Sequence, residues 1–319
     1  MHIDGLGGTA DRGSETLPFL TSPTLQPELL GNVLPSSELP LNGPFVMPRA
    51  ILTPTILVFD SGLGGLTVYR EVTRARPDAR CLYAADDALF PYGALDDGRL
   101  VARVLAVMTE LIAAHAPDLV VIACNTASTI VLPALRKHFD LPFVGTVPAI
   151  KPACAASASK RVSVLGTEST VRREYTRALI REFAGGCEVT LVGSPLLAGL
   201  AEAALRGETI TDEAIAAEIA PCFVAQDAAR TDTVVLACTH YPLLLERMER
   251  LAPWPVAWVD PAPAIARRVV ELIWPAREKT APSPASATFT SDRAPSPVLA
   301  AALARFGLAQ AAATGVPSA

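Results

Sequence analysis

Apolar residues along this chain gather in short runs that alternate with longer amphipathic stretches. The runs have the length and β-branched content of buried strands, and the stretches between them have the period of helices. Strand-length runs occur at 55–59, 80–84, 120–124, 161–165, 188–192, 234–238 and 287–290. Helices are predicted up to residue 76, at 98–115, at 127–138, up to residue 183, around residue 202, at 211–227 and at 297–306. This alternation predicts an α/β fold with mainly parallel sheets.

Two of the apolar runs end in the same way. The run at 120–124 closes with Ala123 and Cys124, and the run at 234–238 closes with Ala237 and Cys238. Small polar residues follow each cysteine. Because ligands of open α/β sheets bind at the carboxyl ends of the strands, both thiols are predicted to lie at such an edge.

The two cysteines also belong to a longer repeat. Cys124 and Cys238 are 114 positions apart, and the Pro-Ala-Ile elements that begin at Pro148 and Pro263 are 115 apart. Two landmarks at nearly one separation predict an internal duplication, with two similar α/β lobes facing each other. We assign 54–147 plus 258–310 to the first lobe and 148–257 to the second. The Pro-, Gly- and Ser-rich stretch 1–53 and the tail 311–319 are expected to be disordered.

Composition narrows the class of protein. Half of the residues are hydrophobic and the mean hydropathy is +0.35, yet no apolar run reaches the length of a membrane-spanning helix, so no membrane partner is expected. The net charge of −5 and the absence of a basic stripe argue against nucleic acid as the main partner. The six cysteines form no C-x-x-C motif, and the first residues lack a signal-peptide pattern, which favours a reducing cytoplasm.

The paired thiols suggest one kind of chemistry. A thiolate forms readily at a helix N-terminus, and each cysteine is predicted where a strand turns into a helix. Two opposed thiols can hold one substrate carbon between them, one removing a proton as thiolate and the other donating a proton to the opposite face. Such a pair inverts a stereocentre without a cofactor.

Several other interpretations remain open at this point. A cysteine at a strand end is often only a small buried hydrophobe, the interpretation adopted for Cys81, Cys154, Cys187 and Cys222. Cys238 and His240 with Cys124 and Asp60 are a candidate metal site, although their spacing fits no common zinc signature. Cysteine with His240 is also a candidate hydrolase nucleophile and base, which leaves the second thiol unexplained. Six polar residues are candidate helix N-caps, namely Asp60, Ser61, Asn125, Thr126, Thr167 and Thr239.

Five motifs resemble those of a known family. They are residues 59–65, the Pro-Tyr-Gly of 91–93, residues 123–127, Gly-Thr at 166–167, and Cys-Thr-His-Tyr-Pro at 238–242. Together they resemble the glutamate racemases of the aspartate/glutamate racemase superfamily, in order, from about residue 55 to residue 308. The resemblance implies two Rossmann-like lobes related by a pseudo-twofold axis, with the active site between them. It implies a pyridoxal-independent racemase that makes D-glutamate for peptidoglycan. No cofactor or metal is then expected, the ligands are L- and D-glutamate, and a homodimer is an allowed assembly.

The same resemblance implies roles for individual residues. Cys124 would deprotonate D-glutamate with support from Asp60, and Cys238 would deprotonate L-glutamate with support from His240. The positions implied in substrate binding are Asp60, Ser61, Pro91, Tyr92, Gly93, Asn125, Thr126, Thr167, Glu202, Thr239 and His240.

The chain departs from the family pattern near Glu202. Ser194 stands where the family often has cysteine, Gly199 where a proline is common, and Ser169 where glycine is usual. These departures concern Glu202 and one loop rather than the thiol pair. The motifs contain neither Arg nor Lys, so we expect hydroxyl, amide and backbone N–H groups at helix N-termini to bind the glutamate carboxylates. Those helix ends are also expected to lower the pKa of each thiol.

Overall fold

The structure is a computed structural model that describes residues 53–226, 229–274, 285–291 and 293–310. All of these residues belong to one compact unit, Met47–Ala319. The segments expected to be disordered, 1–53 and 311–319, lie outside the described residues, apart from Thr53. None of the helices in the described part of the chain is both long and apolar enough to cross a bilayer.

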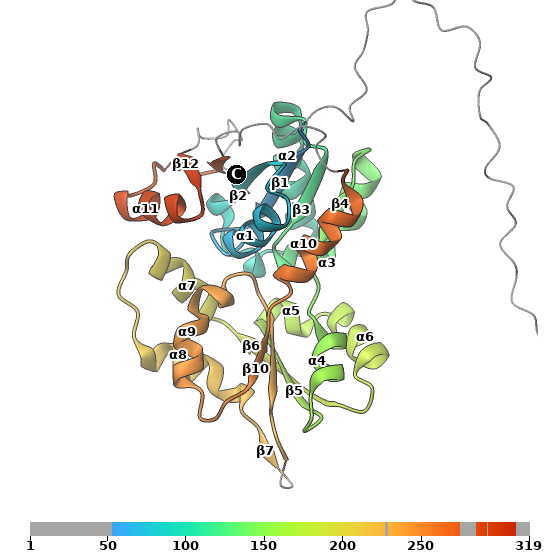
Figure 1. Ribbon diagram of the computed structural model, residues 1–319, viewed down its shortest axis with the longest axis vertical. Helices are drawn as coiled ribbons and strands as arrows, with labels where there is room; N and C mark the ends of the chain where they lie inside the picture. The colour runs from blue at the N-terminus through green and yellow to red at the C-terminus, as the bar shows by residue number, and fades with distance from the viewer. Residues whose placement is uncertain (1–52, 227–228, 275–284, 292, 311–319) are drawn as a thin grey trace, which may run out of the picture. The chain divides into compact units, whose positions relative to one another are not determined.

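The first lobe is built on a parallel sheet. Its strands are β1 (Thr55–Asp60), β2 (Arg80–Ala85), β3 (Leu119–Ile122), β4 (Phe143–Gly145), β11 (Ala285–Phe289) and β12 (Leu308–Gln310). Its helices are α1 (Leu66–Ala75), α2 (Asp97–His115), α3 (Asn125–His138), α10 (Ala262–Leu272) and α11 (Pro297–Arg305), with 3-10 turns η2 (Asp87–Leu89) and η3 (Tyr92–Ala94). The strand order is β12-β11-β2-β1-β3-β4. One face is covered by α1, α10 and α11, and the other by α2 and α3 (Figure 1).

The second lobe is built on a smaller parallel sheet. Its strands are β5 (Arg161–Thr167), β6 (Glu188–Ser194), β9 (Thr233–Ala237) and β10 (Ala257–Val259). Its helices are α4 (Ile150–Ala156), α5 (Glu168–Arg172), α6 (Glu174–Phe183), α7 (Leu197–Leu205), α8 (Asp212–Ile219) and α9 (Leu245–Leu251), with 3-10 turns η4 (Ala220–Cys222) and η5 (Tyr241–Leu244). A hairpin of β7 (Ala225–Gln226) and β8 (Ala229–Arg230) is separate from the sheet. Helices α4 and α6 cover one face, and α7, α8 and α9 the other.

The two sheets share one topology. The first contains the neighbours β2-β1-β3-β4, and the second has the order β6-β5-β9-β10. In each, the first strand of the lobe is flanked by its second and third, and the fourth lies beside the third. The shared order supports the predicted duplication, and the α/β fold with two Rossmann-like lobes is confirmed. The boundary expected between 257 and 258 falls inside β10, and all of β10 pairs with β9 in the sheet of the second lobe. The assignment of residue ranges to the two lobes remains a proposal.

Helix α2 shows how the sequence pattern produces an element. Asp96 caps its N-terminus by accepting a hydrogen bond from the backbone N–H of Arg99. Its buried apolar side chains recur with helical spacing and face the first sheet, namely Leu100, Val104, Val107, Met108 and Leu111. The helix ends at Ala116, whose φ of 44° lies in the left-handed region. The expected range of 98–115 is therefore nearly that observed.

Two expected helices are shorter than predicted. The helix predicted at 211–227 ends at Ile219, so the prediction is wrong beyond that residue. Pro221 lacks an N–H and its ring does not fit an α-helical interior. The helix expected to reach residue 183 is broken at Arg173, which is extended (ψ 139°) and separates α5 from α6. Arg173 instead forms a bidentate ion pair with Asp97 of the first lobe.

Candidate active site

Both thiols of the predicted pair line one small pocket. Cys124 follows β3 and is the N-cap residue of α3, and Cys238 follows β9. The two strands lie in different sheets, so the carboxyl ends of both sheets meet at this pocket. The residues that line it are Ser61, Phe90, Pro91, Tyr92, Gly93, Cys124, Asn125, Thr126, Thr167, Ala198, Cys238, Thr239 and His240. Its volume of about 20 Å³ has room for roughly one water molecule, so an amino acid enters only when the lobes or side chains move.

The lining set contains most of the residues that the sequence indicated. Asp60 and Glu202 are the exceptions, since each lies behind a lining residue and bonds to it. Phe90 and Ala198 line the pocket and were not predicted. Phe90 directly precedes the Pro-Tyr-Gly motif, and its ring centroid is 5.2 Å from that of His240. Ala198 is four residues before Glu202 on α7, which places both on one helix face.

The Cys124 half of the site is built by β1, β3 and α3. The sulfur of Cys124 is 3.6 Å from the hydroxyl of Ser61, and the backbone N–H of Ala127 also bonds to it. Asp60 is fully buried at the end of β1. Its carboxylate accepts a hydrogen bond from the Ser61 N–H at 2.8 Å and another from the Thr239 hydroxyl at 3.0 Å. Asp60 thus reaches Cys124 through its charge and through Ser61.

The pKa values in this half run against one expectation. Burial raises the pKa of Cys124, and the negative charge of Asp60 raises it further. The Ala127 N–H and the Ser61 hydroxyl lower it, but by less. The start of α3 thus acts on this thiol in the expected direction, through the Ala127 N–H, but the cost of burying the thiolate exceeds that effect and the net pKa is raised. Burial raises the pKa of Asp60 as well, against the opposing effect of His240.

The Cys238 half has a different partner. The sulfur of Cys238 is 3.9 Å from Nδ1 of His240, and Nε2 of the same ring is 2.9 Å from Oε2 of Glu202. His240 and Glu202 are both buried. Burial alone would raise the pKa of Glu202, but the hydrogen bond and charge of His240, the Leu63 N–H and Arg206 together lower it. Glu202 is thus held as a carboxylate against the imidazole, despite the changes at Ser194 and Gly199.

His240 has a partner for each state of its Nε2. Burial acts to lower the pKa of His240, but its bonds to Cys238 and Glu202 outweigh burial and raise the pKa to about 10. The protonated Nε2 donates to Glu202. The backbone N–H of Gly64 also points at Nε2, at 3.1 Å, and only a deprotonated nitrogen can accept it. Loss of the proton from Nε2 therefore leaves that nitrogen with a hydrogen bond.

Each half of the site is tied to the opposite lobe. Thr239 of the second lobe bonds to Asp60, and the backbone N–H groups of Leu63 and Gly64 in the first lobe bond to Glu202 and His240. The approach at Gly64 is close enough to require glycine, because a Cβ there would lie 2.3 Å from Nδ1 of His240. The loop after β1 thus positions the imidazole of the other lobe.

Asn125 is the clearest sign that this pocket binds a polar ligand. It is the first residue of α3, is 3% exposed and lines the pocket. Neither its amide nitrogen nor its carbonyl oxygen has a hydrogen-bond partner. A buried polar group normally has a partner, and a ligand that carries both acceptor and donor groups would supply two here.

Tyr92 contributes to the pocket in a way the sequence did not indicate. Its hydroxyl donates to Oδ2 of Asp86 at 2.6 Å, so the oxygen is directed at the protein. Asp86 is fully buried, forms an ion pair with Arg103 and accepts a hydrogen bond from Thr290. This network anchors the loop that carries Pro91 and Gly93, and Tyr92 serves the pocket as part of its wall.

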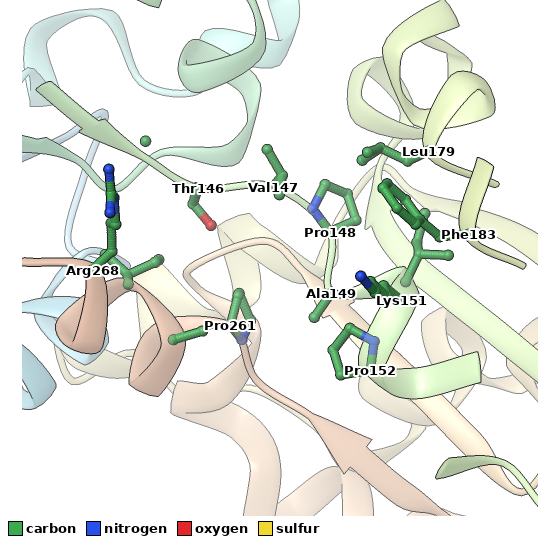
Figure 2. Close-up of a pocket in the computed structure, with 14 residues that line it drawn as sticks. Thr146, Val147, Pro148, Ala149, Lys151, Pro152, Leu179, Phe183, Pro261 and Arg268 are labelled. Carbon is green, nitrogen blue, oxygen red and sulfur yellow. The ribbon is translucent and has the colours of Figure 1, made fainter. Parts of the chain in front are cut away.

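A larger pocket of about 280 Å³ lies away from the thiols (Figure 2). It is lined by the segment that follows β4, the segment that follows β10, and two side chains of α6. Phe183, Leu179, Pro148 and Pro152 gather on one side in Figure 2, and Pro261 and Arg268 lie on the other. Both Pro-Ala-Ile elements of the duplication contribute to the lining, the second through Ala264 and Ile265. It contains no cysteine, so the two-thiol chemistry belongs to the smaller pocket.

The remaining sequence hypotheses have simple outcomes. Cys81, Cys154 and Cys222 are buried among apolar side chains of three cores, and Cys187 is half-buried beside Cys154. Within the described ranges, no group of three or more His, Cys, Asp or Glu side chains is arranged to hold a metal ion.

Comparison with known proteins adds independent evidence. A model of the Asp/Glu/Hydantoin racemase family matches residues 59–269. The chain is 57% identical over 232 residues to glutamate racemase of Brucella anthropi, which covers 72% of this chain and 84% of that one. It is 56% identical over 228 residues to glutamate racemase of Sinorhizobium medicae, covering 71% and 84%.

Solved structures agree with these relatives. The Escherichia coli glutamate racemase in complex with L-glutamate and the activator UDP-MurNAc-Ala superposes with a TM-score of 0.77 at 40% identity, covering 83% of this chain and all of that one. Glutamate racemase from Aquifex pyrophilus superposes with a TM-score of 0.60 at 29% identity, covering 79% and 94%. The chain therefore belongs to the Asp/Glu/Hydantoin racemase family and, within it, to the glutamate racemases.

Proposed function

We propose that this chain interconverts L- and D-glutamate by proton transfer through Cys124 and Cys238. The observation that carries the proposal is that both thiols line one pocket while projecting from different lobes. A carbon held between them offers one face to each sulfur. Each thiol also has its own polar neighbours, so each can alternate between thiol and thiolate.

The reaction from D-glutamate begins with Cys124 as thiolate and Cys238 as thiol. Cys124 removes the proton from Cα, and the electron pair of the broken C–H bond is delocalised into the α-carboxylate. Cys238 then donates its proton to the opposite face, which gives L-glutamate. The reaction from L-glutamate runs the same steps in reverse, with Cys238 as the base. No atom is lost and no oxidation state changes, so the thiols suffice without a cofactor.

The groups around the pocket suit the substrate. The amide of Asn125 can donate to a carboxylate and accept from an ammonium group. The hydroxyls of Thr126 and Thr167 lie 3.3 Å apart across the two lobes and offer donors from both sides. Asp60 brings negative charge near the ammonium group, and α3 begins directly after Cys124, so backbone N–H groups at its N-terminus can stabilise the developing charge.

Circular dichroism tests the activity directly. Purified protein incubated with L-glutamate, without pyridoxal phosphate, should bring the signal to zero, and D-glutamate should converge on the same end point. In D₂O the product should carry deuterium at Cα. Glutamate binding without exchange at Cα would indicate a binding protein instead. Activity that needs added pyridoxal phosphate, or a product other than glutamate, would contradict the proposal.

The proposal extends to the cellular role. D-glutamate made by this chain would supply peptidoglycan synthesis, a role that belongs to the family. A cytoplasmic location follows from that role, and a homodimer is the assembly we propose. Sedimentation velocity of the purified protein distinguishes a dimer from a monomer, and depletion of the enzyme in the cell should create a requirement for D-glutamate.

A further inference from the structure

Arg206 contacts the Cys238 half of the site without lining the pocket. It caps the C-terminus of α7, and its guanidinium donates to Oε1 of Glu202 at 2.8 Å. The side chain of Arg206 is 34% exposed, whereas that of Glu202 is 8% exposed. A partly exposed cation therefore holds one oxygen of a buried carboxylate.

The two oxygens of Glu202 have separate partners. Oε1 bonds to Arg206, while Oε2 accepts the Leu63 N–H at 2.9 Å and lies 2.9 Å from Nε2 of His240. A carboxylate fixed at one oxygen cannot rotate freely about its last bond. The contact with Arg206 thus keeps Oε2 directed at the imidazole, and the imidazole in turn faces Cys238.

We propose that Arg206 is a positioning residue for the Cys238 half of the reaction, acting through Glu202 on His240. This inference rests on the proposed two-thiol function. It assigns to a side chain outside the recognised motifs the task of holding the carboxylate that orients the imidazole.

The effect should be confined to one half of the site. The charged or titratable groups around His240 are Cys238, Glu202 and Asp60, and the ring of Phe90 covers it. Of these three groups, Glu202 is the one to which Arg206 bonds. Cys124, in contrast, is bonded to Ser61 and Ala127, neither of which bonds to Arg206. Loss of the Arg206 side chain should therefore slow proton transfer at Cys238 and leave proton transfer at Cys124 unchanged.

Racemase kinetics alone cannot locate such an effect. Because L- and D-glutamate have equal free energies, kcat/KM is equal in the two directions for every variant. A one-sided reaction is needed, and 3-chloroglutamate provides it. A thiolate removes the Cα proton, the C–H electron pair forms a C=C bond, and chloride leaves with the C–Cl pair. The enamine tautomerises and is hydrolysed to 2-oxoglutarate and ammonium.

The experiment combines Arg206→Met with each thiol variant. In the Cys124→Ser background, chloride release from the L-form depends on Cys238 and should fall about tenfold, the loss expected for one charge-assisted hydrogen bond to a buried carboxylate. In the Cys238→Ser background, release from the D-form depends on Cys124 and should be unchanged. Arg206→Lys, which keeps the cation, should restore most of the L-form rate. Arg74→Met is the matched control, since Arg74 also pairs with a glutamate, Glu71, on its own helix, and neither residue lines the pocket that holds the thiols.

The outcomes separate the inference from the function on which it rests. Equal losses on both enantiomers, no loss on either, or no recovery with Arg206→Lys would overturn the positioning role while leaving the two-thiol assignment intact. Thiol variants that show no opposite preference for the two enantiomers before Arg206 is changed would overturn both.

Discussion

The two halves of this active site have the same framework and different chemistry. In both lobes the third strand of the sheet ends two residues or less before a cysteine, and the strand orders match. Around Cys124, however, the neighbours are a serine hydroxyl, a helix N-terminus and the charge of Asp60. Around Cys238, the neighbour is an imidazole held by a carboxylate.

The difference shows which part of a duplicated fold is constrained. The strand places the sulfur at the sheet edge, and this placement is the same in both lobes. The residues after the cysteine decide how its proton is handled. Cys124 is the N-cap residue of an α-helix of 14 residues, whereas Cys238 is followed by Thr239, His240 and a 3-10 turn. The second thiol therefore has a side chain as its partner where the first has a helix end.

The largest expected effect comes from removing either thiol. Cys124→Ser and Cys238→Ser should each lower racemisation by at least about 10³-fold, because a serine hydroxyl is a far weaker acid than a thiol. Each variant should still eliminate chloride from one enantiomer of 3-chloroglutamate. Cys124→Ser should act on the L-form through Cys238, and Cys238→Ser on the D-form through Cys124.

Chloride release from each enantiomer measures this pair of preferences. The assignment of one face to each thiol is wrong if both variants prefer the same enantiomer, or if either keeps full racemase activity. A hydrolase with a single essential thiol would show one inactive variant and one active one.

The next effect distinguishes the partners of the two thiols. His240→Gln should slow the step at Cys238, and Asp60→Asn the step at Cys124, each by about 10²-fold. Slowing one step makes it more fully rate-limiting. With glutamate deuterated at Cα, His240→Gln should enlarge the isotope effect on the L-enantiomer, and Asp60→Asn that on the D-enantiomer. Isotope effects that change equally for both enantiomers in both variants would show that these residues do not serve separate thiols.

A smaller effect is expected for Asn125, a substrate-binding residue that serves both directions of the reaction. Asn125→Ala should raise KM about tenfold for both enantiomers, since one buried hydrogen-bonding group for the substrate is lost. Thr146→Val is a matched control, because the Thr146 hydroxyl is also buried and without a partner but lines the larger pocket. Steady-state kinetics on each enantiomer decides the point. An unchanged KM for Asn125→Ala would remove Asn125 from the binding site.

The remaining effect concerns stability against pH rather than activity. The pKa of His240 is raised to about 10 in the folded protein, above the value of about 6.5 expected when unfolded. Its contribution is therefore fully present below pH 6.5 and is lost as the pH rises through 10. Urea unfolding across this range should show stability falling more in the wild type than in His240→Gln. Parallel curves for the two proteins would contradict a raised pKa.

The sequence alone determined the elements that place the thiols. Apolar runs of strand length that end in cysteine predicted both sheet edges. A run of apolar, β-branched residues is a local feature of the sequence, and it marks a buried strand whatever the rest of the chain does. The repeat of two landmarks predicted two lobes. Helix α2 followed from its cap and its apolar stripe. The breaks at Pro221 and Arg173 differ in origin. The first follows from the missing N–H of proline, a local signal in the sequence, and the second accompanies an ion pair with Asp97, which is far from Arg173 in the chain.

Only the tertiary structure decided how the thiols are surrounded. Asp60 and Thr239 are 179 residues apart, and Leu63 and Glu202 are 139 apart, yet each pair forms a hydrogen bond. Burial, which reverses the effect of the helix end on Cys124, is also a property of the whole fold. Residue types and local spacing therefore specified where acid–base groups stand along the chain. Their partners and their protonation depend on long-range contacts and desolvation, which arise only when the two lobes close around one pocket.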